Sequence, residues 1–490
     1  FWGAAEPLNH AYNPPRGGYD SMSRDAIIQA FEFTYYHFGI HMWVIFTLPG
    51  LAVGYFVYKR KMPARVSSIF APLLGRRVYE APGKLLDALG IIGTVFGLAV
   101  SVGLGVLQIS AGMNILWDVP LVTPVQIGII VAITLAASLS VATGLDKGVK
   151  ILSNMNIAAT IALMIFVLAT GPTLKLLGQI TESFGIYAQS LPELMFWVDS
   201  YNDNPGWHAT WTAFYWAWTI CWSPFVGMFF ARISRGRTIR EFTAVTVFAP
   251  TTILILAFTI FGGTAISFNR EGIAGFDGES SNEQVLFAMF QDLPLGSITP
   301  YILLVVLAVF FVTSADSASV VMGTMSSKGD PTPNKLVVIF WGVCMMGIAI
   351  VMLLTGGEDV LTGLQNLTIL AALPFCLVLL AMMVAFIRDL RSDPMFIRRT
   401  YARTAMDNAV MRGIEEHGDD FEFTVQHAEG DRGAGHDFDS SAERYTEWYQ
   451  RTDEEGENVD YDFDTGVWSD GYDPKHDKNH PDFEGEKKEK

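Results

Sequence analysis

The residues from Trp207 to Phe229 are rich in aromatic side chains that could bind a cationic group. If this segment is a helix with 100° per residue, many of its rings fall within a stripe about 100° wide. A quaternary ammonium offers no hydrogen-bond donor, so proteins hold it with ring faces, each contributing up to ~2 kcal/mol when desolvated. The same stripe is also compatible with simple packing against neighbouring helices. Its members are Trp211, Phe214, Tyr215, Trp218, Trp222, Phe225 and Phe229.

A second group of candidate residues lies in the segment from Phe310 to Ser317, which reads FFVTSADS. Thr313 and Ser314 place two hydroxyl groups side by side, and oxygen ligands suit a hard cation such as Na⁺. The alternative is that these hydroxyls donate to the preceding helical turn, as Ser and Thr often do. Asp316 lies in the same apolar segment, where an ionisable residue is by default a functional candidate.

Long apolar segments must position these residues. Half of the chain is hydrophobic, only 17% is charged, and the mean hydropathy is +0.31. Nine segments have about the 20 residues needed to cross a hydrocarbon core of about 30 Å. They are 26–58, 85–112, 121–144, 151–177, 209–231, 243–268, 298–325, 336–355 and 363–387. The sequence therefore predicts an all-α polytopic membrane protein.

Pro224 is expected to interrupt the aromatic helix. Close helix contacts are expected at four glycines: Gly93, Gly97, Gly103 and Gly105.

Patterns typical of enzyme sites are absent from the sequence. It has no G-x-S-x-G, no Walker loop, no zinc-ligand spacing and no paired carboxylates inside the apolar segments. Cys221, Cys344 and Cys376 all lie inside predicted spans, which predicts neither disulfides nor a metal cluster. His37 and His41 share a helix face, but no further ligand is evident beside them, and Glu6 has a possible structural role. We expect neither enzymatic activity nor a cofactor.

The distribution of basic residues predicts the orientation of the chain in the membrane. Basic residues gather in alternate loops, while the intervening loops are acidic or nearly free of them, so the basic loops and the carboxyl tail should be cytoplasmic. The basic positions are Lys59, Arg60, Lys61, Arg65, Arg76, Arg77, Lys84, Lys147, Lys150, Arg232, Arg235, Arg237, Arg240, Lys328, Lys335, Arg388 and Arg391.

Most of the net charge of −17 belongs to the tail, residues 389–490, which holds 28 acidic and 13 basic residues. With few aliphatic residues and no sustained periodicity, this tail is expected to be mostly disordered apart from a short helix over 393–412. A regulatory domain is the alternative interpretation of the tail.

The order of residues from Trp207 to Phe242 closely resembles the signature segment of the betaine/choline/carnitine transporter (BCCT) family. That signature reads W-x-x-F-Y-W-x-W-W-x-x-W-x-P-F-V-G-x-F followed by A-R-I-S-R-G-R-x-I-R-E-F, and the chain matches it through about thirty residues. The resemblance covers residues 1 to about 390. The opening residues Phe1 to Leu8 resemble the end of the third family helix, so we expect the chain to be amino-terminally truncated.

The resemblance implies a substrate site built from two helices. The family pattern H-W-x-x-x-x-W-x-x-Y aligns here with Phe38, Trp43 and Phe46, and the second Trp of W-x-W-W-x-x-W aligns with Thr219. Phe38, Phe46 and Thr219 therefore replace Trp, Tyr and Trp. Because Phe is a poorer cation–π partner than Trp and Thr has no ring, recognition would depend more on neighbouring tryptophans. These are Trp216, Trp218 and Trp222.

The resemblance also implies a coupling ion. The segment from Phe310 to Ser317 matches the family pattern F-x-x-T-S-x-D-S, in which sodium-coupled members use the Thr and Ser side chains and the Phe carbonyl. Thr313, Ser314 and Phe310 are therefore the candidate sodium ligands. Thr94 matches part of a second family sodium site, but Leu98 occupies the position where a second hydroxyl is expected.

The fold implied by the resemblance is a LeuT-like core of two inverted five-helix repeats. The membrane domain would span residues 1–388, with a first repeat of about 1–180 and a second of about 207–388. It would contain nine complete transmembrane helices plus the end of another. Such repeats place the substrate near the bilayer midplane, where broken helices expose backbone groups to ions.

We therefore expect a multi-pass plasma-membrane transporter that imports a quaternary-ammonium compatible solute of the glycine betaine, choline or carnitine type by Na⁺ symport. The alternatives are a Na⁺-coupled amino-acid symporter or a substrate exchanger on the same fold. The expected partners are a small zwitterionic or cationic solute and the lipid bilayer, with no nucleic acid. A homotrimer is implied by the resemblance alone.

Overall fold

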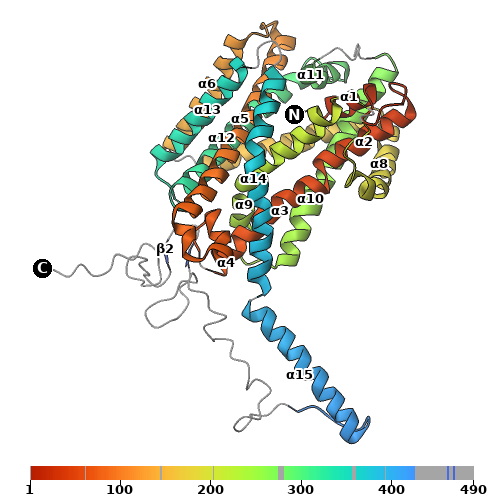
Figure 1. The fold of residues 1–490 in the computed structure, drawn as a ribbon. Helices are drawn as coiled ribbons and strands as arrows, with labels where there is room; N and C mark the ends of the chain where they lie inside the picture. The colour runs from red at the N-terminus through yellow and green to blue at the C-terminus, as the bar shows by residue number, and fades with distance from the viewer. Residues whose placement is uncertain are drawn as a thin grey trace, which may run out of the picture.

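The computed structural model describes residues 2–60, 62–143, 146–201, 204–273, 281–330, 332–355, 360–391, 393–424, 461–462 and 467–468. The described part is a helical bundle from which the last helix projects (Figure 1). The first half contains α1 (Ala5–Tyr12), α2 (Arg24–Phe38), α3 (Ile40–Tyr58), the 3₁₀ turn η1 (Ser67–Phe70), α4 (Ala71–Leu74), η2 (Gly75–Tyr79), α5 (Ala81–Trp117), α6 (Thr123–Thr143), α7 (Asp146–Thr170) and α8 (Thr173–Leu194).

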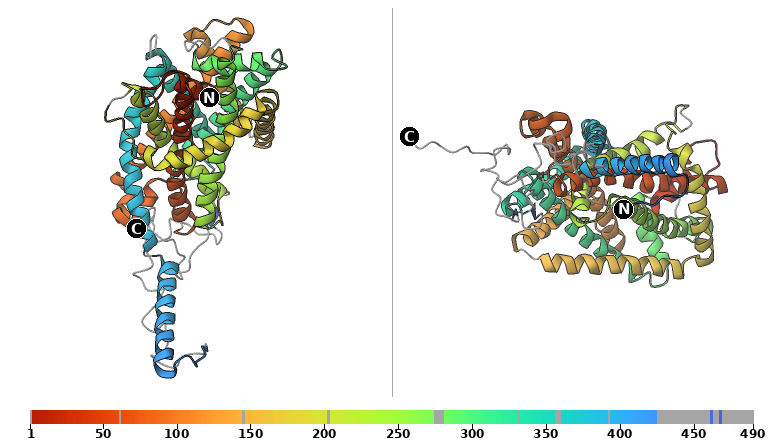
Figure 2. Two further views of the ribbon diagram at one scale, coloured as in Figure 1. Left: turned by 90° about the vertical axis from the view of Figure 1, so that its right-hand side faces the viewer. Right: turned by 90° about the horizontal axis from the view of Figure 1, so that it is seen from below.

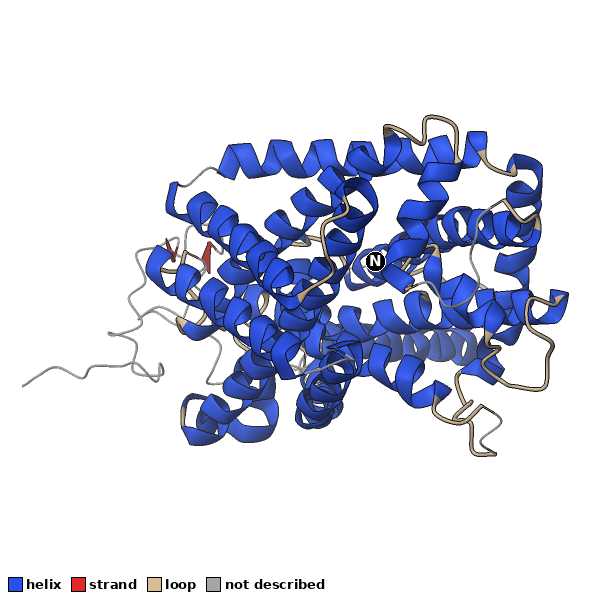
Figure 3. Cartoon of the chain, turned by 90° about the horizontal axis from the view of Figure 1, so that it is seen from above, coloured by secondary structure: helices blue, strands red, loops and turns tan. Residues whose placement is uncertain are grey.

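The second half begins with a π-helical turn, η3 (Ala209–Ala213), and continues as α9 (Phe214–Ile233) and α10 (Ile239–Arg270). It then contains α11 (Asn282–Asp292), α12 (Thr299–Ser326), α13 (Lys335–Thr355), α14 (Val360–Arg391) and α15 (Pro394–His417). Two short strands, β1 (Tyr461–Asp462) and β2 (Val467–Trp468), pair in antiparallel fashion. Seen from above, helices dominate the described part (Figure 3).

Eight helical segments of the described chain are long and apolar enough to cross a membrane. These eight segments correspond to eight of the nine predicted spans. The residues of the remaining one, 209–231, form η3 and α9 within the bundle. Outward faces of α6 and α7 expose large apolar side chains, among them Leu135, Leu139, Ile157 and Ile165. An exposed apolar surface of this kind is suited to lipid rather than water. The expected all-α polytopic membrane architecture is confirmed, whereas the division into inverted repeats stays a prediction.

The first span is broken at Gly39, between α2 and α3. A Cβ at this position would lie 2.4 Å from the carbonyl oxygen of Tyr35 and 2.7 Å from the Tyr187 hydroxyl, so only glycine fits. That hydroxyl accepts a hydrogen bond of 3.2 Å from the backbone N–H of Ile40, which opens α3. The break redirects the chain just after Phe38 and separates the predicted box residues onto two helices.

Pro224, by contrast, does not interrupt α9, and that prediction was wrong. A proline inside a helix leaves the carbonyl four residues earlier without its backbone donor. Here the carbonyl is that of Ile220, and it accepts a hydrogen bond of 2.8 Å from the hydroxyl of Ser223. The serine immediately before the proline therefore compensates for the missing N–H, and the helix continues to Ile233.

Glycines bring α5 into close contact with its neighbours, as the sequence predicts. A Cβ on Gly97 would lie 2.9 Å from the Cβ of Cys221 and 2.9 Å from Cδ1 of Trp222, both on α9. A Cβ on Gly105 would lie 2.0 Å from the ring of Phe311 on α12. These positions place α5 against the two helices that carry the candidate aromatic and hydroxyl residues.

Gly97→Ala should lower the thermal unfolding midpoint of the purified protein, because overpacking a tight contact costs about 1–3 kcal/mol. Gly128→Ala is the matched control, since a Cβ on Gly128 on α6 meets no atom within 4 Å. Both substitutions add one methyl group to a helix, so differential scanning fluorimetry compares the contact alone. Equal midpoints for the two variants would contradict the close packing of α5 on α9.

The loops predicted to be basic gather at one end of the bundle. Arg65 Nε donates to the carbonyl oxygen of Lys328 at 2.7 Å, and Lys335 Nζ donates to that of Ala142 at 3.2 Å. From the same end α14 continues downward toward α15, which projects away from the bundle in Figure 1 and in the left view of Figure 2. The cytoplasmic assignment of this end stays a prediction.

The helix expected over 393–412 is present as α15, which extends it to His417. Most of the predicted acidic tail, residues 425–460, 463–466 and 469–490, lies outside the described residues, and so does its predicted disorder.

Candidate substrate and ion site

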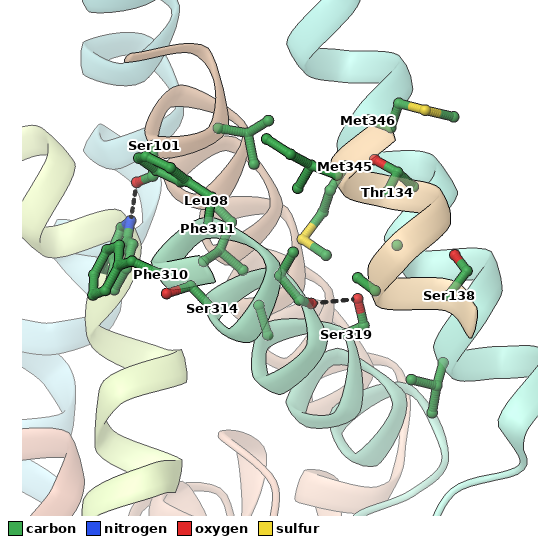
Figure 4. Close-up of a pocket in the computed structure, with 18 of the residues that line it drawn as sticks. Leu98, Ser101, Thr134, Ser138, Phe310, Phe311, Ser314, Ser319, Met345 and Met346 are labelled. Carbon is green, nitrogen blue, oxygen red and sulfur yellow. Dashed lines mark hydrogen bonds between the residues drawn. The ribbon is translucent and has the colours of Figure 1, made fainter. Parts of the chain in front are cut away.

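A cavity of about 200 Å³ lies between α5, α6, α9, α12 and α13. Figure 4 shows Leu98, Ser101, Phe310, Phe311 and Ser314 on one side of it, with Thr134, Ser138, Met345 and Met346 on the other. The lining is mainly apolar and aromatic, with a few hydroxyl groups. The predicted site residues that line it are Phe46, Trp218, Thr219, Trp222, Phe310 and Ser314.

The two tryptophans of α9 are fixed by shared hydrogen bonds to α5. The indole N–H of Trp222 lies 2.9 Å from both the carbonyl oxygen of Gly97 and the hydroxyl oxygen of Ser101. The indole N–H of Trp218 lies 3.2 Å and 3.0 Å from the same two atoms. The two rings meet edge to face, with centroids 6.1 Å apart. Because both N–H groups are bonded to protein, the rings offer the cavity their π surfaces and not their donors.

A second cavity, of about 280 Å³, lies on the other side of Trp218 and Phe310. Phe38, Tyr215 and Phe258 line it, and Trp218 and Phe310 line both cavities. The Trp218 side chain is 8% exposed, whereas Phe310 is 48% exposed. These two rings therefore form the boundary between the cavities, and a solute that moves from one to the other would pass them.

Trp43 and Trp216 lie outside the lining of both cavities. The Trp43 ring contacts Phe46 with centroids 5.5 Å apart, and its N–H donates to the carbonyl oxygen of Phe38 at 3.1 Å. Trp216 packs instead against Tyr36 and lies near His41, with centroids 5.0 Å and 5.9 Å away. Trp43 thus contacts two predicted box residues, while Trp216 faces α2 and the start of α3.

The candidate sodium ligands belong to an unbroken helix. α12 runs from Thr299 to Ser326, and the hydroxyl of Thr313 donates to the carbonyl oxygens of Val309 and Phe310 at 3.0 and 3.1 Å. This is the arrangement that the alternative interpretation of the Thr–Ser pair describes. Ser314 lines the first cavity beside Phe310. The Thr94 hydroxyl donates to the carbonyl oxygen of Gly90 at 2.8 Å, and Leu98 lines the cavity.

Sequence reasoning missed several residues around the two cavities. Ser101 lies one helical turn after Gly97 on the small-residue face of α5, and this spacing was the available signal for an indole acceptor. Phe311 and Phe258 come from helices whose composition is generally apolar, so nothing in the sequence distinguishes them from core residues. Their positions depend on how α10 and α12 pack against α9.

Known proteins resemble the chain over most of its length. The family model described as BCCT, the betaine/carnitine/choline family transporter, matches residues 1–395. The match thus includes all of α1 to α14 and ends at the start of α15.

Curated relatives match over most of the chain. The betaine/ectoine transporter LcoP of Corynebacterium glutamicum is 54% identical over 477 residues, which are 97% of this chain and 76% of the relative. The ectoine/glycine betaine/proline transporter EctP of the same organism is 49% identical over 85% of this chain and 68% of the relative. The glycine betaine transporter OpuD of Bacillus subtilis is 38% identical over 81% of this chain and 77% of the relative.

Proposed function

Because the chain belongs to the betaine/carnitine/choline transporter family, we propose that it imports a quaternary-ammonium or related zwitterionic compatible solute across the plasma membrane. The family consists of membrane transporters and not enzymes, and the long apolar helices fit that membership. The proposed mechanism is alternating access in which a Na⁺ gradient drives the solute inward.

The observation that carries the proposed cargo is the pair of tryptophans at the first cavity. Trp218 and Trp222 present desolvated ring surfaces whose N–H groups are bonded to α5. Ring faces with no free donor suit a methylated ammonium group, which cannot donate a hydrogen bond. Relatives named as transporters of betaine and ectoine support the same class of solute.

Ectoine is included in the proposal because of the altered aromatic box. Phe38, Phe46 and Thr219 replace larger or more electron-rich rings at the matching family positions. A box with fewer strong cation–π partners should discriminate less sharply between a quaternary ammonium and a delocalised cyclic cation. The two relatives from Corynebacterium glutamicum carry ectoine in their names beside betaine. Choline and carnitine remain within the proposed solute class.

Sodium coupling is proposed at Thr313, Ser314 and the Phe310 carbonyl. Ser314 and Phe310 lie at the cavity that Trp218 and Trp222 also line, so an ion held there would be adjacent to the solute. Binding one would then stabilise the conformation that binds the other, which is the thermodynamic requirement for symport. The hydroxyl of Thr313 donates its hydrogen to backbone carbonyl oxygens, so its oxygen lone pairs would be the ones that bind the cation.

The test is uptake of labelled glycine betaine and ectoine by the full-length protein in liposomes, with and without an inward Na⁺ gradient. Gradient-dependent uptake is the expected result. Uptake that does not depend on the Na⁺ gradient but increases with unlabelled solute inside the liposome would favour the alternative of an exchanger. If labelled proline or another primary or secondary amine is carried and betaine is not, the Na⁺-coupled amino-acid symporter is favoured.

Ser314→Ala and Thr313→Ala should each raise the Na⁺ concentration for half-maximal uptake by about 10-fold or more, because a bond to a charged group contributes about 1.5–3 kcal/mol. Thr324→Ala is the control, since its hydroxyl also donates to the preceding turn of α12, at 3.2 Å to the carbonyl of Val320. The Na⁺ dependence of initial uptake rates measures the change. A uniform loss of rate with unchanged Na⁺ dependence in the two variants would remove these residues from the ion site.

A homotrimer is the assembly that we propose for the protein in the membrane. The mass of the detergent-solubilised complex, measured by light scattering with the detergent contribution subtracted, distinguishes a trimer from a monomer or dimer.

A further inference from the structure

A buried cluster of ionisable side chains joins α1 to α2, apart from the two cavities. Glu6 and His10 are one turn apart on α1, and His37 lies on α2. All three side chains are 0% exposed. Oε1 of Glu6 lies 3.0 Å from Nδ1 of His37 and 3.3 Å from Nε2 of His10. One carboxylate oxygen therefore sits beside a nitrogen from each of two imidazole rings.

Further polar groups hold the outer sides of this cluster. The hydroxyl of Tyr215 on α9 donates to Oε2 of Glu6 at 2.5 Å, and Thr212 Oγ1 lies 3.0 Å from Nε2 of His37. Thr212 belongs to the π-helical turn η3, a distortion that is frequent at functional sites. These contacts orient the Glu6 carboxylate and the His37 ring through the atoms that face away from the other members of the cluster, as supporting residues do around metal ligands.

His10 is the residue that a hydrogen-bonded network alone does not explain. Neither of its ring nitrogens has a hydrogen-bond partner among the described residues, although the side chain is fully buried. Its ring is held by aromatic contacts to Trp207 and Trp211, with centroids 4.9 and 4.6 Å away. Buried polar nitrogens are almost always bonded. Nε2 of His10 lies 3.3 Å from the Glu6 carboxylate oxygen without a hydrogen bond to it, so this nitrogen is open to a further ligand that the carboxylate could share.

We propose that Glu6, His10 and His37 form a binding site for a divalent transition-metal ion, with Zn²⁺ as the expected occupant. One ligand atom from each residue lies within 4.8 Å of the others. With metal–ligand bonds of about 2.0–2.1 Å, two ligands of a tetrahedral ion are roughly 3.3 Å apart, close to the separations of 3.0 and 3.3 Å from Glu6 Oε1. Imidazole nitrogens select such ions over Na⁺, Mg²⁺ and Ca²⁺, which prefer oxygen.

The bound ion would stabilise the packing of three helices near the solute path. The metal would link α1 to α2 directly, and Tyr215, which also lines the second cavity, would connect the metal-bound carboxylate to α9. The ion would thus reinforce the contact between the first two described helices and the aromatic helix. This role is independent of the proposed solute and of Na⁺ coupling.

The test compares His10→Phe with His41→Phe in the full-length protein. Phenylalanine keeps an aromatic ring at position 10, and no hydrogen bond of His10 is lost. His41 on α3 is the matched control, because its two ring nitrogens also have no hydrogen-bond partner among the described residues and it lies outside the cluster. Each protein is stripped with chelator, loaded with Zn²⁺ or Co²⁺, separated from free metal and analysed for bound ion and for visible Co²⁺ absorption.

The expected result is one tightly bound ion per chain in the wild type and in His41→Phe, with strong visible bands of four-coordinate Co²⁺, and loss of that ion in His10→Phe. Tyr215→Phe should keep the ion but weaken its affinity about 10–100-fold, as loss of a supporting hydrogen bond does. Wild-type protein without stoichiometric metal, or a folded His10→Phe variant that keeps the ion, would overturn the proposal. Size-exclusion profiles and thermal midpoints identify which variants are folded.

Discussion

Replacing Trp218 with alanine should raise the transport KM for glycine betaine about 30-fold. A desolvated cation–π contact contributes up to ~2 kcal/mol, and each 1.4 kcal/mol corresponds to a factor of ten in affinity. Trp218 is nearly buried, lines both cavities and is held by hydrogen bonds to Gly97 and Ser101, so its ring is already positioned for a solute. Initial uptake rates in liposomes at saturating Na⁺ measure the effect.

The control for this variant is Trp117→Ala. Trp117 ends α5, is 53% exposed and lies outside both cavities, so its loss removes the same side chain without touching a solute. Trp218→Phe distinguishes recognition from packing, since Phe keeps a weaker ring face and should give an intermediate KM. If Trp218→Ala lowers the maximal rate and leaves KM for betaine unchanged, the ring serves packing or transport steps and not recognition of the ammonium.

The contrast between α9 and α3 shows which parts of the site the sequence could predict. The aromatic stripe of α9 follows from helical periodicity alone, and Trp218 and Trp222 do line one cavity together. The relative position of Phe38 and Trp43 cannot be derived from helical periodicity, because the helix breaks at Gly39 between them. The conformation at Gly39 depends on the hydroxyl of Tyr187, which comes from α8. No local pattern encodes that contact.

Pro224 and His10 illustrate two further limits of local reasoning. Proline usually breaks a helix, yet the hydroxyl of Ser223 bonds the carbonyl that Pro224 leaves without a donor. The i,i+4 spacing of Glu6 and His10 is visible in the sequence, but the third member of the cluster, His37, lies beyond a loop. The sequence does show His37 beside His41 on one helix face. The break at Gly39 separates this pair, and the hydrogen-bond partners of His37 are Glu6 of α1 and Thr212 of η3.

Asp389→Ala should produce the largest loss of stability, about 3–5 kcal/mol, because it removes the carboxylate that pairs with a buried guanidinium. Nε of Arg60 donates to Oδ2 of Asp389 at 2.8 Å, and the two side chains are only 2% and 1% exposed. The pair ties the end of α3 to the end of α14, and beside it Lys59 Nζ lies 2.8 Å from Asp393. Thermal and denaturant unfolding of the purified protein in detergent measure the loss.

A double substitution separates the loss of stability caused by removing one charge of the pair from the net contribution of the ion pair to stability. Arg60→Met combined with Asp389→Leu removes both charges and should be more stable than Asp389→Ala, because an apolar pair leaves no charge uncompensated. The exposed pair of Arg24 and Glu182, 3.5 Å apart and 79% and 59% exposed, is the control, and Glu182→Ala should cost no more than about 1 kcal/mol. Equal losses of stability for Asp389→Ala and Glu182→Ala would mean that solvent reaches Arg60. The contact between α3 and α14 would then depend on apolar contacts such as that of Tyr55 with Phe386.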